Sequence, residues 1–468
     1  MARSMEFRRA VTLEQPYDLI VCGGGPAGVP AALAARRAGL SVLLIEAMGQ
    51  LGGVGTSAGV SHLLGGRLWD NSGWCVGGIF REVVETLAAR GGAINPADIR
   101  ADDWNPHGWS TKVSPLSYGV PFDPIAMVAH LDELLLEAGV DVLFFSQVVD
   151  VEVADGRITH VVVQNKSGLR AFPARAVVDA TGDGDIAARS GCEVVKGRPE
   201  DGAMTPVSLI FHVDRVDQEA LKGYIQANDS RRLRELIADL RARGAWDFPY
   251  EIFISVQLNE PGTMMINTTR ICGVDGTDAR SLSRGMMQGR REVQRLFALM
   301  RAHFPGFADS RVKLVAPNLG VRETRRIVGD FVYTVADLLD ARDFPDTIGF
   351  SSWVWDLPDP RRPSHQPMHA AATSLKRTLT PIPYRVLVPR PIANLICPGR
   401  MISVERDVLG PLREMAPCYA MGQAAGQAAV QTVRDGCAFA AIDVGRLRDE
   451  LRAAGAIVDI AMPATAAG

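Results

Sequence analysis

The chain of 468 residues lacks the marks of several large protein classes. Its seven cysteines are scattered and form no C-x-x-C pair, which argues against an iron–sulfur cluster, a zinc site and a disulfide framework. It has no basic block and a net charge of only -3, so nucleic acid and anionic membranes are poor partners. No apolar run reaches membrane-spanning length, and the N-terminus lacks the apolar core of a signal peptide. We therefore expect a cytoplasmic protein.

The most informative segment is YDLIVCGGGPAGVPAALAARRAGLSVLLIEAMGQLGGVGT, residues 17–56. Its pattern predicts a buried strand over 18–22, a helix ending near 38 and a second strand over 41–45. Gly23, Gly25 and Gly28 have G-x-G-x-x-G spacing, which permits a tight turn, close approach of the backbone to a pyrophosphate and packing of helix on strand. Glu46 ends the second strand, where a carboxylate can accept both ribose hydroxyls and disfavours a 2′-phosphate. The segment predicts a dinucleotide site.

Three later glycine-rich stretches indicate FAD rather than NAD. QLGGVGTSAG follows Glu46 directly, and ARAVVDATGDGD (174–185) is another buried strand that runs into glycines and carboxylates. ANLICPGRMIS (393–403) is the third, and GPLREMAPCYAMGQAAGQAA after it has the pattern of a long helix of small residues. The positive end of that helix can face a flavin pyrimidine ring.

With these motifs the chain resembles the FAD-dependent oxidoreductases of the two-dinucleotide-domain, glutathione-reductase-like flavoprotein superfamily over nearly its whole length. The resemblance also rests on GGIFREVVETLAARGG (77–92), QNKSG (164–168), GVRETRRIVGD (320–330) and PIPYRVLVP (381–389). It implies an α/β fold, with a discontinuous Rossmann-like FAD-binding domain and an inserted α+β substrate domain. The chain departs from the family at 353–367, where an Asp-x-His element is common. Here Asp356 is followed by no histidine before His365.

The motifs and the resemblance together imply one set of FAD contacts. Val148 and Val149 are expected near the adenine. Residues 413–415 are expected to contact the flavin through their backbone amides. Cys75 and His62 stand in no attachment pattern, which argues against a covalent flavin link, and no metal site is expected. The predicted contacts are Gly23, Gly25, Pro26, Ala27, Gly28, Glu46, Gly52, Gly53, Val54, Val148, Val149, Ala180, Thr181, Gly182, Asp183, Gly399, Arg400, Arg413, Glu414 and Met415.

The predicted FAD domain comprises residues 12–205 and 385–468, because its strands lie at both ends of the chain. Residues 137–163 predict a strand meander. Residues 206–384 form the predicted substrate domain, with helices over 218–243 and 284–303 and extended runs at 252–258 and 263–267. The segment 60–120 has little periodicity and is either an active-site loop or a surface excursion.

No second strand–G-x-G-x-x-G–helix unit and no C-x-x-x-x-C pair occur, so electrons are expected to come from an organic substrate. The leading hypothesis is an FAD-dependent dehydrogenase or oxidase that removes hydride from a small molecule at a C–O or C–N carbon. The alternatives are a flavin-dependent reductase or monooxygenase, and an electron-transfer subunit of a larger complex. The oligomeric state stays open, a homo-oligomer included.

Arg322 and Arg325 are the first catalytic candidates. Their guanidinium groups could clamp a substrate carboxylate or stabilise negative charge on the reduced flavin. Alternatively, they belong to a structural salt-bridge cluster with Glu323. The sequence leaves both interpretations open.

Tyr384 is a further candidate, because it stands at the predicted return to the FAD domain, and pockets form at domain seams. A buried, hydrogen-bonded tyrosine is an equally ordinary explanation. His365 and His369 are the nearest general-base candidates, since histidine titrates near neutral pH. Histidines of a proline-rich surface loop more often have no catalytic role.

Overall fold

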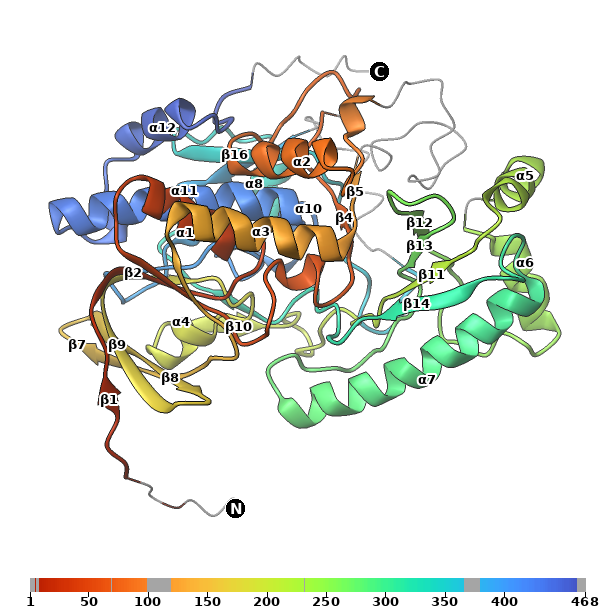
Figure 1. Ribbon diagram of the computed structural model, residues 1–468, viewed down its shortest axis with the longest axis horizontal. Helices are drawn as coiled ribbons and strands as arrows, with labels where there is room; N and C mark the ends of the chain where they lie inside the picture. Colours follow the sequence, from red (N-terminus) through yellow and green to blue (C-terminus); the bar gives the residue numbers. More distant parts are fainter. Residues whose placement is uncertain are drawn as a thin grey trace.

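The computed structural model describes residues 5, 8–68, 70–98, 119–230, 232–365 and 379–460. They form a large α/β domain with a smaller cap domain beside it (Figure 1). The α/β domain is built around a sheet of strand order β6-β3-β2-β9-β8-β7. The cap carries its own sheet and the longest helix, α7 (Ala279–His303).

The first part of the main sheet is parallel. It contains β6 (Asp141–Leu143), β3 (Val42–Ile45), β2 (Tyr17–Cys22) and the end of β9 (Gly168–Asp179), against which β18 (Leu395–Ile396) also runs parallel. Apart from partly buried Asp18, β2 and β3 are buried along their length, as their near-continuous apolar sequences require. The first part of β9 pairs with the antiparallel hairpin β7 (Gln147–Ala154) and β8 (Arg157–Asn165), which is the predicted meander, and with the short β1 (Thr12–Leu13).

Helices cover one face of this sheet, and two of them approach unusually closely. α1 (Gly28–Arg37) lies against α11 (Met415–Asp435), the predicted small-residue helix. A Cβ atom on Gly422 would stand 2.1 Å from the carbonyl oxygen of Ala27, and one on Gly426 would stand 2.1 Å from that of Ala31. The glycines of α11 therefore let the two backbones meet. Helices α2 (Ile79–Ala89), α3 (Pro124–Ala138) and α12 (Val444–Ala453) share the same hydrophobic core (Figure 1).

The cap is an antiparallel sheet with helices around it. Its strand order is β12 (Ser255–Gln257), β13 (Met264–Ile266), β11 (Phe211–Asp214) and β14 (Arg311–Val315). With α5 (Gln218–Asn228), α6 (Arg234–Ala242) and α7 it encloses a separate aromatic-rich core. Helix α7 begins before the predicted start at 284, because Asp278 caps it by accepting a hydrogen bond from the Ser281 amide at 2.7 Å.

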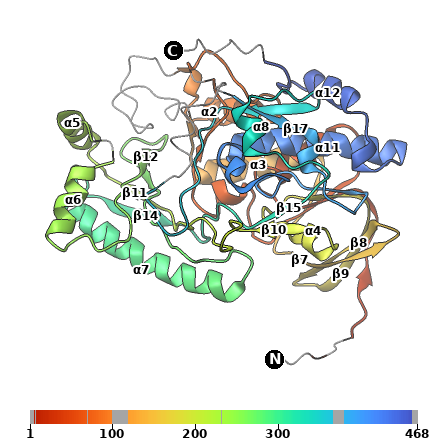
Figure 2. The same ribbon diagram turned by 180° about the vertical axis from the view of Figure 1, so that it is seen from behind.

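The structure differs from the predicted boundary between the domains. The chain returns to the α/β domain at β15 (Arg325–Ile327), which pairs with β10 (Val194–Lys196), and not at residue 385 (Figure 2). Beyond it, β16 (Thr347–Ser351) pairs with β17 (Thr380–Pro383), and the aromatic and aliphatic residues of 333–350 join the core beneath α1 and α11. A buried apolar run has the same composition in either core, so the sequence pattern could not assign it.

The remaining short elements are β4 (His62–Leu63), β5 (Val120–Pro121), α4 (Asp185–Arg189), α8 (Val335–Leu339) and α10 (Leu409–Leu412). β4 and β5 pair with each other, so both ends of the irregular segment 60–120 are anchored on the α/β domain. Residues 69 and 99–118 of that segment lie outside the described residues. Among the helices that are described, none is long and apolar enough to span a membrane.

Candidate functional site

A cavity of about 680 Å³ lies where β2, β3 and β9 end, and we call it the outer cavity. Its floor comes from the turns that follow these three strands and from the loop before α11. The carboxyl edge of a parallel sheet is where nucleotide sites form in such folds. Its volume falls within the range of ligand pockets, roughly 300–1,000 Å³.

The glycines after β2 have different structural reasons. Gly23 has a φ of +108°, and a Cβ on Gly28 would stand 1.7 Å from the Gly23 carbonyl oxygen, so both are required by the turn itself. A Cβ on Gly25 would meet only the Cα of Gly53, at 3.8 Å, and otherwise point into open space. Gly25 lines the outer cavity. The turn thus leaves a cradle that a side chain at Gly25 would fill, as a pyrophosphate requires.

Glu46 lines the same cavity, and its carboxylate is held from behind. One oxygen accepts a hydrogen bond from the Gly24 amide and the other from the Met48 amide, each at 2.7 Å. Burial raises the pKa of Glu46, and these backbone hydrogen bonds act in the opposite direction. The bonds fix the carboxylate where its remaining lone pairs can accept ribose hydroxyls, so this residue fits an adenosine ribose.

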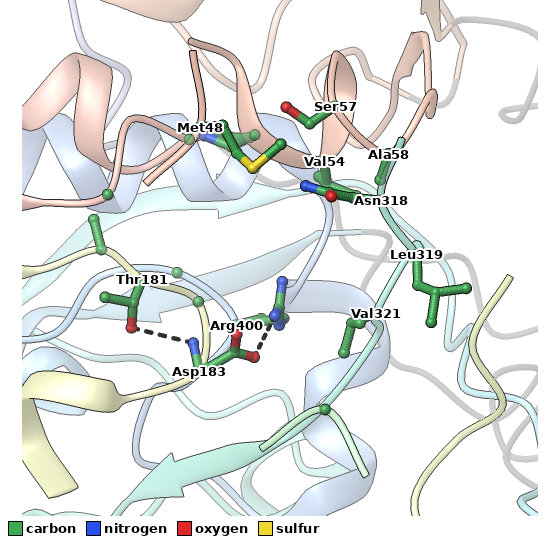
Figure 3. Close-up of a pocket in the computed structure, with 18 of the residues that line it drawn as sticks. Met48, Val54, Ser57, Ala58, Thr181, Asp183, Asn318, Leu319, Val321 and Arg400 are labelled. Carbon is green, nitrogen blue, oxygen red and sulfur yellow. Dashed lines mark hydrogen bonds and ion pairs between the residues drawn. The ribbon is translucent and has the colours of Figure 1, made fainter. Parts of the chain in front are cut away.

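The DATGDGD segment forms the third turn. Asp179 is buried and accepts hydrogen bonds from the Ile186 and Ala187 amides at 2.9 and 3.0 Å, which fixes the start of α4. Asp183 lines the outer cavity and accepts from Arg400 Nη2 at 2.5 Å (Figure 3). A Thr324 hydroxyl bonds to the same Asp183 oxygen at 2.7 Å. Two chain segments from different parts of the sequence are thereby joined at this carboxylate.

The cap supplies the opposite wall of the outer cavity. Asn318 and Leu319 come from the strand-like run before the GVRETRR motif, and Val321 belongs to the motif itself. All three lie across from Thr181 in Figure 3. Helix α7 adds Leu282, Ser283, Met286, Met287 and Arg290. The cavity therefore lies between the two domains.

A second, smaller cavity of about 100 Å³ adjoins the first, and we call it the inner cavity. Val54, Val321, Arg400, Arg413 and Met415 line both cavities. The rest of the inner cavity has an apolar wall, to which the cap strands contribute heavily. This wall consists of Val60, Leu64, Ile210, Ile252, Ile254, Val256 and Met265.

Ionisable groups also line the inner cavity. Arg413 pairs with Glu414 at 2.8 Å and with Asp356 at 3.2 Å, and all three border the cavity. Glu414 precedes the first turn of α11, and burial raises the pKa of its carboxyl. Arg322 borders the same cavity, and desolvation by the surrounding protein lowers its pKa well below the usual value, although part of its surface stays accessible.

Most of the predicted FAD contacts border these cavities. Glu414 lines the inner cavity but not the outer one. The predicted residues that line the outer cavity are Gly23, Gly25, Pro26, Ala27, Glu46, Gly53, Val54, Ala180, Thr181, Gly182, Asp183, Gly399, Arg400, Arg413 and Met415.

Four predicted FAD contacts border neither cavity. Gly28 packs on the Gly23 carbonyl, and Gly52 packs against the Thr56 side chain. Val148 contributes to the core on the far side of the sheet, and Val149 is 39% exposed on β7. Near the predicted ribose site, the outer cavity is lined by Glu46 and Met48 and not by residues of β7. The placement of the adenine beside β7 is therefore not supported.

Of the predicted catalytic residues, only Arg322 borders a cavity. No helix begins at 322; Arg325 is instead the first residue of β15 and donates to the Asp183 carbonyl at 3.1 Å and to Asp185 at 2.9 Å. The two arginines therefore point to different places. Glu323 orients neither, because it is fully buried against Arg406, at 2.6 Å.

Tyr384 and His365 lie away from both cavities. The Tyr384 hydroxyl donates to the Phe439 carbonyl at 2.9 Å inside the main core, because the domain seam is not at this residue. His365 is exposed, and in the described part of the chain its hydrogen bonds are those of its backbone, to Arg362 and Asp359. His369 lies outside the described residues. Cys75 is buried, donates to the Gly65 carbonyl, and has its pKa raised to about 12 by burial.

Several residues that line the cavities were not predicted from the sequence. Arg270 and Trp353 border the inner cavity, as does His62, which the sequence had raised only as an attachment point. Arg270 and His62 stand in no motif, and Trp353 only begins the 353–367 segment that departs from the family pattern, so the three-dimensional arrangement was needed to identify them. Met48 had a weaker signal, since it follows the ribose-binding carboxylate by two positions.

Comparisons with known proteins extend these observations. The chain is 30% identical over 219 residues to the thiamine thiazole synthase of Aeropyrum pernix, which covers 44% of this chain and 69% of that protein. It is 43% identical over 53 residues to the dihydrolipoyl dehydrogenase of Trypanosoma brucei brucei, only 11% of either protein. Among solved structures, the myxobacterial chondrochloren halogenase is similar, with a TM-score of 0.47, 14% identity, and coverage of 94% of this chain and 78% of that chain.

A family model described as FAD dependent oxidoreductase matches residues 18–451. This range contains the glycine turn, the cap, the GVRETRR motif and helix α11. The cradle at Gly25 and the oriented carboxylate of Glu46 fit the pyrophosphate and the ribose of that cofactor. The chain belongs to the FAD-dependent oxidoreductase family and is an enzyme with FAD as its cofactor.

Proposed function

We propose that this enzyme is a dehydrogenase or oxidase that removes hydride from a C–O or C–N carbon of a small organic substrate held in the inner cavity. The observation that carries the proposal is the junction of the two cavities. Val54, Arg413 and Met415 line both the inner cavity and the outer cavity, and the buried carboxyl of Glu414, next to Arg413 and Met415 in the chain, lines the inner cavity. A substrate in the inner cavity would therefore lie next to the FAD site and next to the Glu414 carboxyl.

FAD, when bound, supplies a two-electron acceptor for the hydride. In this chain Glu46 would hold the ribose, and the turn at Gly25 would hold the pyrophosphate through its amides. Arg413 and Met415 border the place where the two cavities meet. These residues bind and orient the cofactor without taking part in proton transfer.

Glu414 is the proposed proton acceptor. Hydride removal from an alcohol or amine carbon leaves an O–H or N–H proton that a base must accept. Burial raises the Glu414 pKa, which makes the carboxylate a stronger base, and the Arg413 pair at 2.8 Å holds it ionised and oriented. The substrate thus loses two electrons and two protons, one of the protons to Glu414.

The apolar wall has two effects on this chemistry. The inner cavity has room for only several water molecules, so a small substrate would displace them all. Exclusion of water strengthens the interaction of the substrate with Arg413 and Glu414. The cap strands that supply Ile210, Val256 and Met265 would therefore set the size of the substrate.

The test is anaerobic reduction of the purified, FAD-loaded enzyme, followed by the loss of flavin absorbance. The panel would contain small alcohols, amines, 2-hydroxy acids and amino acids, with NADH and NADPH in separate reactions. Reduction by a member of the organic panel is the expected result. Reduction by NADH or NADPH alone would overturn the proposal and favour a reductase or monooxygenase.

The role of Glu414 has a matched control. Glu292 is also a buried carboxyl with a raised pKa, but it bonds to Tyr250 and Gln288 inside the cap and borders neither cavity. Glu414→Gln should slow flavin reduction, whereas Glu292→Gln should leave its rate unchanged. Equal rates in the wild type and Glu414→Gln would exclude Glu414 as the base.

A further inference from the structure

Arg270 and Arg322 form a pair of cationic groups that share neutral hydrogen-bond partners. Nη1 of each donates to the Ser208 hydroxyl at 3.0 Å, so the two guanidinium groups converge on one oxygen. Arg270 also donates to the Asn267 and Thr269 carbonyls at 2.9 and 2.8 Å, and Arg322 to the Pro206 carbonyl at 2.8 Å. Among the described residues, neither arginine has a carboxylate within ion-pair distance.

The other arginines of the inner cavity differ in this respect. Arg413 is balanced by Glu414 and Asp356, and Arg400 by Asp183. Arg270 and Arg322, which line the same cavity, have no such carboxylate among the residues that the structure describes. Buried charges are normally paired, because an unpaired buried charge is strongly destabilising. In the described part of the chain, these two guanidinium groups therefore lack a negative partner.

The inner cavity also has donors without acceptors. Arg270 is 4% exposed and its Nε has no hydrogen-bond partner among the described residues. Trp353 is 6% exposed, and its indole Nε1 likewise has none in the described part of the chain. Both residues border the inner cavity and not the outer one, so a cofactor confined to the outer cavity would not reach them. Buried donors of this kind require an acceptor.

We infer that Arg270, Arg322 and Trp353 bind the carboxylate of the substrate, which is a small carboxylic acid whose remaining part is apolar. A carboxylate supplies the missing negative charge and up to four lone-pair positions for the guanidinium and indole donors. The apolar side chains of the same lining, Ile210, Val256 and Met265 among them, favour hydrocarbon next to the carboxylate. This inference rests on the proposed function in one respect, that the inner cavity is the place of the substrate.

The experiment measures binding rather than turnover. Oxidised, FAD-loaded wild-type enzyme would be titrated by calorimetry with acetate, propionate, isobutyrate and benzoate, and separately with the amide of each acid. An amide has nearly the shape of its acid but no charge. We expect at least one acid to bind roughly tenfold to hundredfold more tightly than its amide, the range of a charge-assisted hydrogen bond.

Three variants assign that preference to residues. Arg270→Met and Arg322→Met should each remove roughly tenfold or more of the affinity for the acid and leave the affinity for the amide unchanged. Arg326→Met is the control, because Arg326 is equally buried but lies near Glu323, at 3.8 Å, and borders neither cavity. It should bind the acid as the wild type does.

The result that would overturn the inference is an affinity for every amide equal to that for its acid, or no binding of any acid. Unchanged binding of acid by folded Arg270→Met and Arg322→Met would overturn it equally. If either variant fails to fold, the comparison of acid and amide on the wild type still decides. Failure of the proposed function is separate: acids would bind selectively, yet no organic compound would reduce the flavin.

Discussion

Replacing Gly25 by valine tests the FAD site in a way that separates binding from folding. A Cβ at this position would meet only the Gly53 Cα, at 3.8 Å, which is ordinary van der Waals contact. The backbone at Gly25 is outside the left-handed region, so valine is not strained there. The branched side chain would instead occupy the cradle that faces the outer cavity.

The expected loss can be estimated from overpacking. Forcing extra methyl groups into an occupied site typically costs about 1–3 kcal/mol. Applied to FAD binding, this corresponds to roughly 5-fold to 150-fold weaker affinity. The free energy of unfolding of the FAD-free protein should change little, because the side chain displaces no protein atom.

The assay has two readouts and two controls. Apoprotein would be titrated with FAD by flavin fluorescence, and its free energy of unfolding measured in urea. Gly223→Val in α5 is the matched control, since nothing lies within 4 Å of a Cβ there, and it should retain full FAD affinity. Gly28→Ala should fail to fold, because its Cβ would stand 1.7 Å from the Gly23 carbonyl oxygen. Wild-type FAD affinity in Gly25→Val would refute the cradle.

Three further predictions follow from the ion pairs and the pKa of Glu414. Because burial raises the Glu414 pKa, the rate of flavin reduction by the substrate should be low at low pH and should increase as the carboxylate ionises. Glu414→Gln should abolish this increase and lower the rate, measured by stopped-flow absorbance, by roughly 10²–10⁴-fold. Glu323→Gln should lower the free energy of unfolding in urea by about 3–5 kcal/mol, since it removes the fully buried carboxylate that pairs with Arg406 at 2.6 Å and leaves only the longer pair with Asp407, at 3.3 Å; a loss below about 1 kcal/mol would contradict this. Arg322→Lys should lower kcat/KM by roughly tenfold to hundredfold. Arg325 pairs with Asp185, so Arg325→Lys should leave kcat/KM unchanged. Equal effects of the two variants in steady-state assays would contradict the placement of Arg322 alone at the substrate.

Most residues that line the outer cavity could be named from the sequence because they follow a local rule. Gly23, Gly25 and Glu46 occupy positions fixed by a strand, a turn and a second strand, and each physical requirement acts within that unit. The same holds for DATGDGD, where the end of β9 places Thr181 and Asp183 beside the first turn. Local sequence therefore determined most of this cavity.

Two expectations differ from what the structure shows. Val148 and Val149 were placed near the adenine from the resemblance alone, but β7 is the edge strand of the sheet, with β8 between it and β9, and neither valine borders the outer cavity. Arg322 and Arg325 were treated as one group because they are close in sequence. The backbone between them is irregular and enters β15, which sends their side chains to different partners.

The inner cavity was not predictable because no segment contains it. Arg270 follows β13, Trp353 follows β16 and Glu414 precedes α11, and they meet only where the cap returns to the α/β domain. Each residue is unremarkable in its local sequence: a buried arginine, a buried tryptophan and a carboxylate beside an arginine. Their significance lies in the balance of charge and donors around one small cavity, which depends on packing between domains. Most of the outer cavity is thus encoded in local sequence, while the inner cavity, where we propose that the substrate binds, depends on contacts that only the complete fold creates.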